Sequence, residues 1–154
     1  MMRRFFFIII SIFIISCNRT VDYIEFKPID KESWSQNDSL LFKFEVTDTL
    51  ANYNLFIHLR HSGQYKYRNI WIQTRIEQPN GQVSKIKSNL PLADKSGAWN
   101  GSGLGDLVDH RFMIIKNRRL KRKGTYQISL KHLLWDKYLD HVMDVGIELE
   151  RTPN

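Results

Sequence analysis

Stretches in which apolar and polar side chains alternate recur along most of the chain. Every second residue from Leu40 to Val46 is apolar, and two of the positions between them are charged. The same period returns at residues 54–61 and at residues 70–77. Since successive side chains of a strand point to opposite faces, a period of two predicts β-strands with one buried face.

Further apolar stretches bring the expected number of short strands to about eight. They lie at residues 21–26, 83–92, 112–115, 126–130 and 142–149. A turn is expected at 78–81, because its Asn-Gly pair suits a positive φ angle. Only residues 131–140 have an apolar spacing that fits a helical turn or two. Many short strands with little helix predict an all-β single domain, an antiparallel β-sandwich or jelly roll.

The start of the chain has the composition of a secretory signal. Arg3 and Arg4 precede eleven uncharged, mostly apolar residues from Phe5 to Ile15. A helix that spans a bilayer needs roughly 20 apolar residues, and this run is shorter and is interrupted by Ser11. The segment therefore predicts a signal peptide that is cleaved from an exported protein.

A cysteine follows this segment directly. The residues Ile14-Ile15-Ser16-Cys17 resemble the bacterial lipobox, in which the cysteine is lipidated and the precursor is cut before it. Cys17 is the single cysteine, so it has no disulfide partner within the chain. The alternative is an ordinary cysteine near a generic cleavage site or in an uncleaved anchor. We expect a signal peptide at 1–16, a lipidated tether at 17–22 and a β-sandwich domain at 23–154.

The chain is basic, and its cations are concentrated in one segment. Removal of residues 1–16 leaves 138 residues and takes away two arginines, which lowers the formal net charge from +7 to +5. The densest basic cluster lies at residues 116–123, between two apolar stretches. It is interpreted as the solvated tip of a hairpin, or else as a contact for anionic headgroups or an acidic partner. No nucleic-acid partner is expected, because no nucleic-acid motif is present.

The glycine-rich segment at residues 101–105 does not match a nucleotide-binding loop. A P-loop requires Gly-Lys followed by Ser or Thr, whereas Asp106 and Leu107 follow Gly105. A dinucleotide fingerprint requires a glycine where Asp106 stands. These glycines are interpreted as a tightly folded loop that packs beneath Trp99. Valine in place of Gly103 is expected to misfold this loop if Gly103 has a positive φ angle.

No catalytic or metal-binding constellation is expected, and no cofactor. Asp94, Asp106, Asp109 and His110 lie within seventeen residues, and carboxylates at such spacings could ligate calcium or could be solvated loop acids and turn caps. Their spacing does not match an EF-hand loop, and the five histidines lack a zinc-binding spacing. No serine lies in a Gly-x-Ser-x-Gly motif. The residues therefore favour a protein that is not an enzyme.

The four tryptophans are candidate contacts for a protein or a sugar. Trp71 shares its face with Gln73 and Arg75, opposite the isoleucines, so it is the expected exposed contact. The other three, Trp34, Trp99 and Trp135, are expected in the core. The candidate contact residues for a partner or a glycan are Trp71, Trp99, Asp106 and His110.

Two segments together resemble the gliding-motility lipoprotein H family (GldH) of Bacteroidota. The first is Pro91-Leu92-Ala93-Asp94 followed by Trp99, the glycines, Asp106 and His110, and the second is Asp144-Val145-Gly146-Ile147. The resemblance covers most of the mature chain. It implies an outer-membrane lipoprotein that supports gliding motility and acts with other gliding or secretion proteins. It implies no catalytic residues.

The tether indicates the side of the membrane, and the tryptophans and carboxylates leave two other functions open. The tether lacks the acidic or lysine-rich run that accompanies surface display in that phylum, so the periplasmic side of the outer membrane is expected. A carbohydrate-binding lipoprotein that uses Trp71 or Trp99 is the alternative function. A hydrolase with a carboxylate pair from Asp94, Asp106 and Asp109 is a third.

Overall fold

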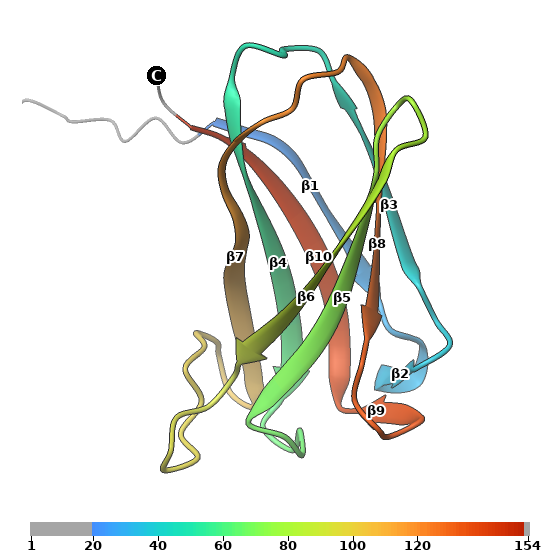
Figure 1. The fold of residues 1–154 in the computed structure, drawn as a ribbon. Helices are drawn as coiled ribbons and strands as arrows, with labels where there is room; N and C mark the ends of the chain where they lie inside the picture. Colours follow the sequence, from blue (N-terminus) through green and yellow to red (C-terminus); the bar gives the residue numbers. More distant parts are fainter. Residues whose placement is uncertain (1–19, 153–154) are drawn as a thin grey trace, which may run out of the picture.

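Two four-stranded antiparallel sheets face each other across one apolar core (Figure 1). The computed structural model describes residues 20–152, so the predicted signal peptide and Cys17 lie outside the described residues. The first sheet has the order β1 (Thr20–Pro28), β10 (Val142–Arg151), β4 (Asn52–Ser62), β7 (Leu107–Arg119). The second has the order β3 (Leu40–Val46), β8 (Gly124–His132), β5 (Asn69–Glu77), β6 (Val83–Pro91).

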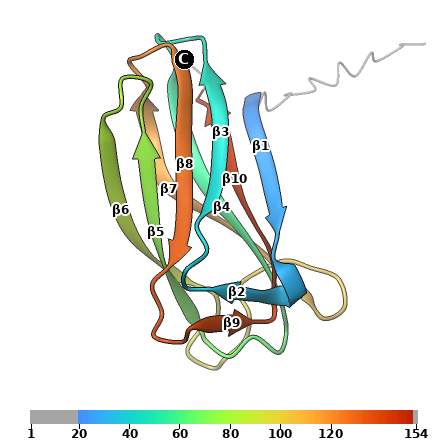
Figure 2. The ribbon, with the colours of Figure 1, turned by 90° about the vertical axis from the view of Figure 1, so that its right-hand side faces the viewer.

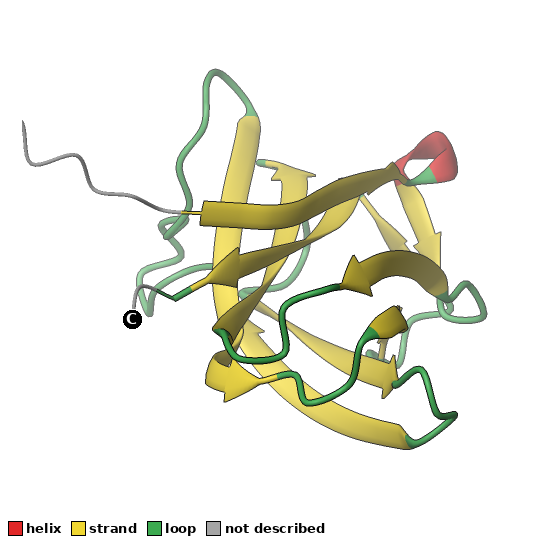
Figure 3. Cartoon of the chain, turned by 90° about the horizontal axis from the view of Figure 1, so that it is seen from above, coloured by secondary structure: helices red, strands yellow, loops and turns green. Residues whose placement is uncertain are grey.

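A third, two-stranded sheet covers one end of the sandwich. It consists of β2 (Ser33–Ser35) and β9 (Tyr138–Asp140), which cross below the ends of β3 and β8 (Figure 2). The short 3-10 turn η1 (Asp30–Glu32) precedes it at the margin of the molecule (Figure 3). Within residues 20–152 no helix has the length and apolar character that a membrane span requires.

The predicted all-β fold is confirmed, and the alternation of side chains is its physical basis. On β3, Phe42 and Phe44 are buried whereas Lys43 and Glu45 are exposed. On β5, Ile70 and Ile72 are fully buried, and Trp71 between them faces outward. Each sheet thus presents one apolar face to the other, and apolar burial of about 25 cal/mol per Å² holds the two together.

Of three predictions on local structure, two are wrong and one is confirmed. Residues 131–140 form no helix; β8 continues to His132 and β9 begins at Tyr138. The basic segment is not a hairpin tip, because β7 and β8 belong to different sheets and the segment crosses from one sheet to the other. The turn at 78–81 is confirmed, with Gly81 at φ 81°.

The sandwich has two distinct ends, because the strands run along its length. One row across the first sheet joins Thr20, Arg151, Tyr53 and Arg118 on adjacent strands. We call this the tether end; it also holds the connections at residues 47–51 and 120–123 (Figure 1). The opposite end, which we call the loop end, holds the connections at residues 63–68, 92–106 and 133–137.

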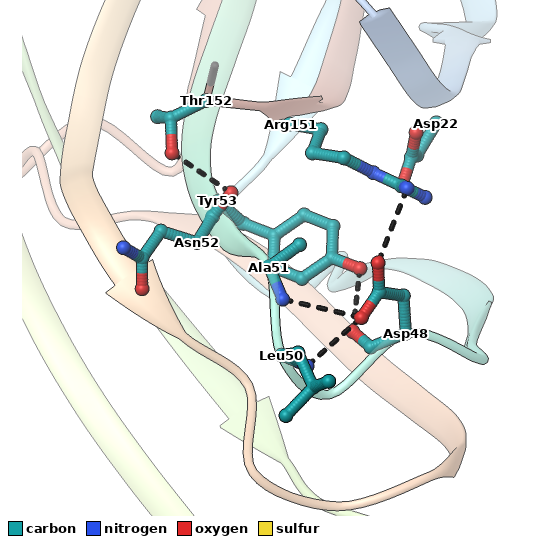
Figure 4. Close-up of polar contacts among 8 residues, drawn as sticks. All are labelled: Asp22, Asp48, Leu50, Ala51, Asn52, Tyr53, Arg151 and Thr152. Atoms are coloured by element: carbon teal, nitrogen blue, oxygen red, sulfur yellow. Dashed lines mark hydrogen bonds and ion pairs between the residues drawn. The ribbon is translucent and has the colours of Figure 1, made fainter. Parts of the chain in front are cut away.

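The first strand is fastened at the tether end by Arg151. Its guanidinium lies between two carboxylates, at 2.8 Å from Asp22 and 3.2 Å from Asp48 (Figure 4). Asp48 Oδ1 also accepts the backbone N–H groups of Leu50 and Ala51. The paired strand begins at Thr20, so residues 20–22 of the predicted tether lie in the sheet.

Candidate functional site

The loop at residues 92–106 carries most of the motif residues and is the first candidate site. Leu92 is fully buried and fixes the start of the loop in the core. The Asp94 carboxylate accepts hydrogen bonds from the Ser96 N–H, the Ser96 hydroxyl and the Ala98 N–H, at 2.7–3.0 Å. These bonds lower the pKa of Asp94, with the Ser96 side chain as the largest cause. Asp94 is therefore a turn cap that closes its own loop.

Trp99 connects this loop to a buried pair of histidines. Its ring lies edge-on to His61, with 4.6 Å between ring centroids, and it is half-buried against the core. His61 Nδ1 donates to the Ser62 carbonyl at 2.7 Å, which leaves its Nε2 as an acceptor for His110 Nε2 at 3.0 Å. The two imidazoles stack at 16°, from strands β4 and β7.

Burial keeps both histidines neutral. His61 and His110 are 0% and 5% exposed. Desolvation lowers the pKa of each, and that of His110 falls to about 4 because His61 adds repulsion to the loss of water. A neutral, hydrogen-bonded pair beneath Trp99 acts here as part of the support for the loop.

The glycines are required by close approach of the loop to β7. A Cβ atom on Gly101 would lie 2.6 Å from the Asp109 carbonyl oxygen, and one on Gly103 would lie 1.9 Å from the Leu107 carbonyl oxygen. Gly105 has φ +67°. Gly103 does not have a positive φ, so the conformational reason predicted for it is wrong, and steric exclusion by Leu107 replaces it.

The three carboxylates in the loop and at the start of β7 have separate roles. Asp94 caps its turn, whereas Asp109 accepts a hydrogen bond from Arg60 Nε at 2.6 Å on the outward face of the first sheet. Asp106 is exposed, and its main-chain carbonyl accepts the Gly63 N–H at 2.7 Å. Among residues 20–152, no group of three or more His, Cys, Asp or Glu side chains is placed to hold a metal ion.

Aromatic side chains gather beside the loop end on the second sheet. Trp71 lies on its outward face, 42% exposed as expected, and its carbonyl accepts the Leu133 N–H at 2.8 Å. The segment that begins at Leu133 presents Trp135, which is 100% exposed, so its predicted core position is wrong. Trp34 is buried, as predicted, with 1% exposure. Trp71 and Trp135 are thus carried by neighbouring segments, while Trp99 contacts His61 of the first sheet.

A hollow of about 260 Å³ lies next to this segment. Tyr67, Asp136 and Tyr138 are among its lining residues. The Tyr67 hydroxyl donates to Asp136 at 2.5 Å, and Lys66 contacts the same carboxylate at 3.3 Å. These bonds lower the pKa of Asp136, with Tyr67 as the largest cause. An ionised carboxylate among tyrosines can accept hydrogen bonds from sugar hydroxyls.

The outward face of the first sheet carries a network of ion pairs that the sequence analysis did not identify. Glu148 accepts from His58 at 2.7 Å and from two nitrogens of Arg111 at 2.8 Å, and Arg111 also pairs with Glu150. The Arg111 guanidinium lies 3.4 Å from the Phe56 ring centre and shields it from water. Alternation along β4 and β10 indicates that these residues face outward, but their pairing requires the strand order.

The second motif, Asp144-Val145-Gly146-Ile147, lies on β10 and contributes to the same outward face of the first sheet. A Cβ on Gly146 would lie 2.7 Å from the Phe26 ring, so glycine lets Phe26 of β1 lie flat on β10 and contact His58. Asp144 pairs with Arg60 at 3.3 Å. The motif residues near the end of the chain therefore join β1 and β4 to the central strand β10.

Comparisons with known proteins agree on one family. The family model described as GldH lipoprotein matches residues 21–149. A gliding motility lipoprotein GldH homolog from Christiangramia forsetii is 27% identical, with 99% of this chain and 100% of the relative covered. Gliding motility lipoprotein GldH from Flavobacterium johnsoniae is 24% identical, with 92% and 91% covered.

A likeness to a solved structure is weak. The infectious bursal disease virus VP2 subviral particle gives a TM-score of 0.36 and 11% identity, with 85% of this chain and 33% of that chain covered. A TM-score of this size carries no argument about the fold or the function.

Proposed function

The chain belongs to the GldH lipoprotein family, and from that premise we propose that it is a non-enzymatic envelope lipoprotein supporting gliding motility and the associated protein secretion. Residues 1–16 are removed as a signal peptide, and lipid on Cys17 anchors the protein to the outer membrane on its periplasmic side. The loop end, with its supported loop at residues 92–106, contacts other gliding or secretion proteins.

The polarity of the sandwich is the observation that supports this proposal. Thr20, which lies three residues after Cys17, starts β1 at the tether end. The loop at residues 92–106 lies at the opposite end (Figure 1). Strand β4 spans 11 residues between them, about 35 Å at the rise of a strand. An anchor at one end thus holds the exposed loops away from the membrane, where a partner can reach them.

The carboxylates of the loop and of β7 support the absence of a catalytic role. Asp94 is engaged by three donors of its own loop, and Asp109 pairs with Arg60. The hydrogen bonds to Asp94 lower its pKa and stabilise its anion, which makes it poorly suited to deliver a proton as a general acid. Turnover of a substrate that is lost in Asp106→Asn would contradict this part of the proposal.

Deletion of the gene tests the proposed function. We expect loss of colony spreading and of secreted adhesins in the culture medium, restored by the wild-type gene and not by Cys17→Ser. That variant removes the thiol that receives the lipid, so an unprocessed, unlipidated precursor should accumulate, as measured by fatty-acid labelling. Normal labelling of Cys17→Ser would refute the anchor, and normal spreading and secretion in the deletion strain would refute the role.

Glycan binding is the second candidate function, favoured by the aromatic side chains at the loop end. Trp135 is fully exposed, and the neighbouring hollow holds the tyrosine-bound Asp136. Exposed indole faces stack on sugar rings, and the carboxylate orients the hydroxyls.

If a glycan binds here, Trp71→Ala and Trp135→Ala should abolish retardation of the protein in polysaccharide gels. Trp71→Phe keeps an aromatic face and should retain part of the retardation. Val83→Ala, at an exposed apolar position of the same sheet, is the matched control and should migrate as the wild type does. Equal migration of all variants on every polysaccharide tried would exclude this function.

A further inference from the structure

A basic hollow opens at the tether end between the two sheets. Its volume is about 430 Å³. Apolar side chains, among them Ile115, Leu120 and Tyr126, form its floor, and its rim carries Arg118, Arg119, Lys121 and Arg122. No aspartate or glutamate is among the lining residues. A cationic rim above an apolar floor matches an amphiphilic anion.

The segment that carries these cations is held in place. Because β7 and β8 belong to opposite sheets, residues 120–123 span the mouth of the sandwich. Leu120 packs against the core, and Arg119 Nε donates to the Thr49 carbonyl at 2.7 Å. The backbone that carries the cations is therefore held across the mouth, in contrast to that of a free hairpin tip.

Most of these cations lack a protein counter-ion. Within the described residues 20–152, Arg118, Lys121, Arg122 and Lys123 form no ion pair, although each is exposed. Elsewhere on the surface, cations such as Arg60, Arg111 and Arg151 are each paired with two carboxylates. An unpaired, concentrated positive charge attracts anions over a Debye length of about 8 Å at physiological salt.

The register places this charge beside the entry of the lipid tether. Thr20, Arg151, Tyr53 and Arg118 form one row across the first sheet. With about 4.8 Å between strands, Arg118 lies about 15 Å from Thr20. Cys17 is three residues before Thr20 and reaches at most about 11 Å from it. A lipid on Cys17 therefore brings the basic mouth to the level of the headgroups.

We propose that the tether end rests on the membrane and that its basic hollow binds the phosphates of anionic phospholipid headgroups. This rests on the proposed lipid anchor at Cys17. The contact orients the sandwich upright, so that the loop end points away from the bilayer. Each lysine or arginine near an anionic surface strengthens such binding about five-fold.

The test uses the full lipidated protein in vesicles and a thiol label at either end. Cys17 is the single cysteine and lipidation consumes its thiol, so an introduced cysteine is labelled alone. Leu50→Cys reports the tether end, where Leu50 is 77% exposed, and Trp135→Cys reports the loop end. Headgroup-quencher lipid is placed in vesicles of phosphatidylcholine alone or with phosphatidylglycerol.

The label at residue 50 should be quenched in phosphatidylglycerol vesicles and much less in phosphatidylcholine, while the label at residue 135 stays unquenched in both. Lys121→Gln with Arg122→Gln should weaken the bound orientation about 25-fold, the product of two five-fold losses. Quenching would then fall to the phosphatidylcholine level. The charge-matched control, Lys95→Gln with Lys137→Gln at the loop end, should behave as the parent does.

The outcomes distinguish a failure of headgroup binding from a failure of the lipid anchor at Cys17 on which it rests. Thiol labelling of the wild type would show that Cys17 carries no lipid and would refute the anchor. A lipidated protein whose residue-50 label is quenched equally in both vesicles, or in neither, would overturn headgroup binding alone. Loss of quenching on addition of soluble glycerol phosphate at its physiological concentration would assign the hollow to a free phosphate ester and would also overturn the proposal.

Discussion

Gly103→Ala should lower the free energy of unfolding by about 3 kcal/mol, the upper part of the range for a group forced into filled space. A methyl group at this position would lie 1.9 Å from the Leu107 carbonyl oxygen. Backbone atoms cannot rotate away as a side chain can, so the loop must leave β7 or the strand must shift. Urea unfolding of the purified protein measures the change.

Gly97→Ala in the same loop is the matched control. Gly97 has φ +92°, and a methyl group added there would have no other atom within 4 Å, so alanine meets backbone strain without a clash. The expected cost is about 1 kcal/mol. Equal stability of the two variants would mean that the loop does not lie against Leu107, and the support of the candidate contact site would need another explanation.

Acidification should destabilise the protein through His110 by about 3 kcal/mol between neutral pH and pH 4. The pKa of His110 falls from 6.5 to about 4 because burial and His61 disfavour its charged form. As the pH drops below 6.5, the unfolded chain takes up a proton that the folded chain does not bind. The stabilisation is therefore complete above pH 6.5, declines down to about pH 4 and is constant below it.

His110→Gln isolates this contribution. The amide keeps a donor for His61 Nε2 but takes up no proton. On acidification, the free energy of unfolding of the variant should therefore fall by about 3 kcal/mol less than that of the wild type. Urea unfolding at about pH 7 and about pH 4 measures the difference. His61 and His132 also have lowered pKa values because of burial, and they remain in both proteins. Parallel losses in wild type and variant would show that His110 is not the titrating group.

The candidate site was accessible to sequence reasoning only in part. A rare string of residues identified the loop at 92–106, and the period of two identified the exposed Trp71, because both are local signals. The sequence did not reveal that Asp94 caps its own turn, or that close contact with β7 leaves no room for a side chain at Gly101 and Gly103. Those roles depend on which strand the loop touches.

His61 and the basic hollow were missed for a related reason. His61 lies 49 residues from His110, and the period of two places it on the buried face with Leu55, Ile57 and Leu59, but no local signal says which side chain it meets there. The cations at residues 118–122 read as a solvated tip, since a linear pattern does not say that β7 and β8 lie in opposite sheets. No local signal distinguishes a hairpin from a crossing between sheets when the connection is short.

The sequence by itself determined the long strands and the all-β class of the fold. Alternation specifies a strand because side-chain direction repeats every two residues, whatever the partner strand is. The tertiary structure alone decided the strand order, which pairs β1 with β10 across the length of the chain. That order brings Thr20 into line with Arg118 and His61 into contact with His110. Pairing depends on contacts between distant residues, and these form only when both sheets close around their common core.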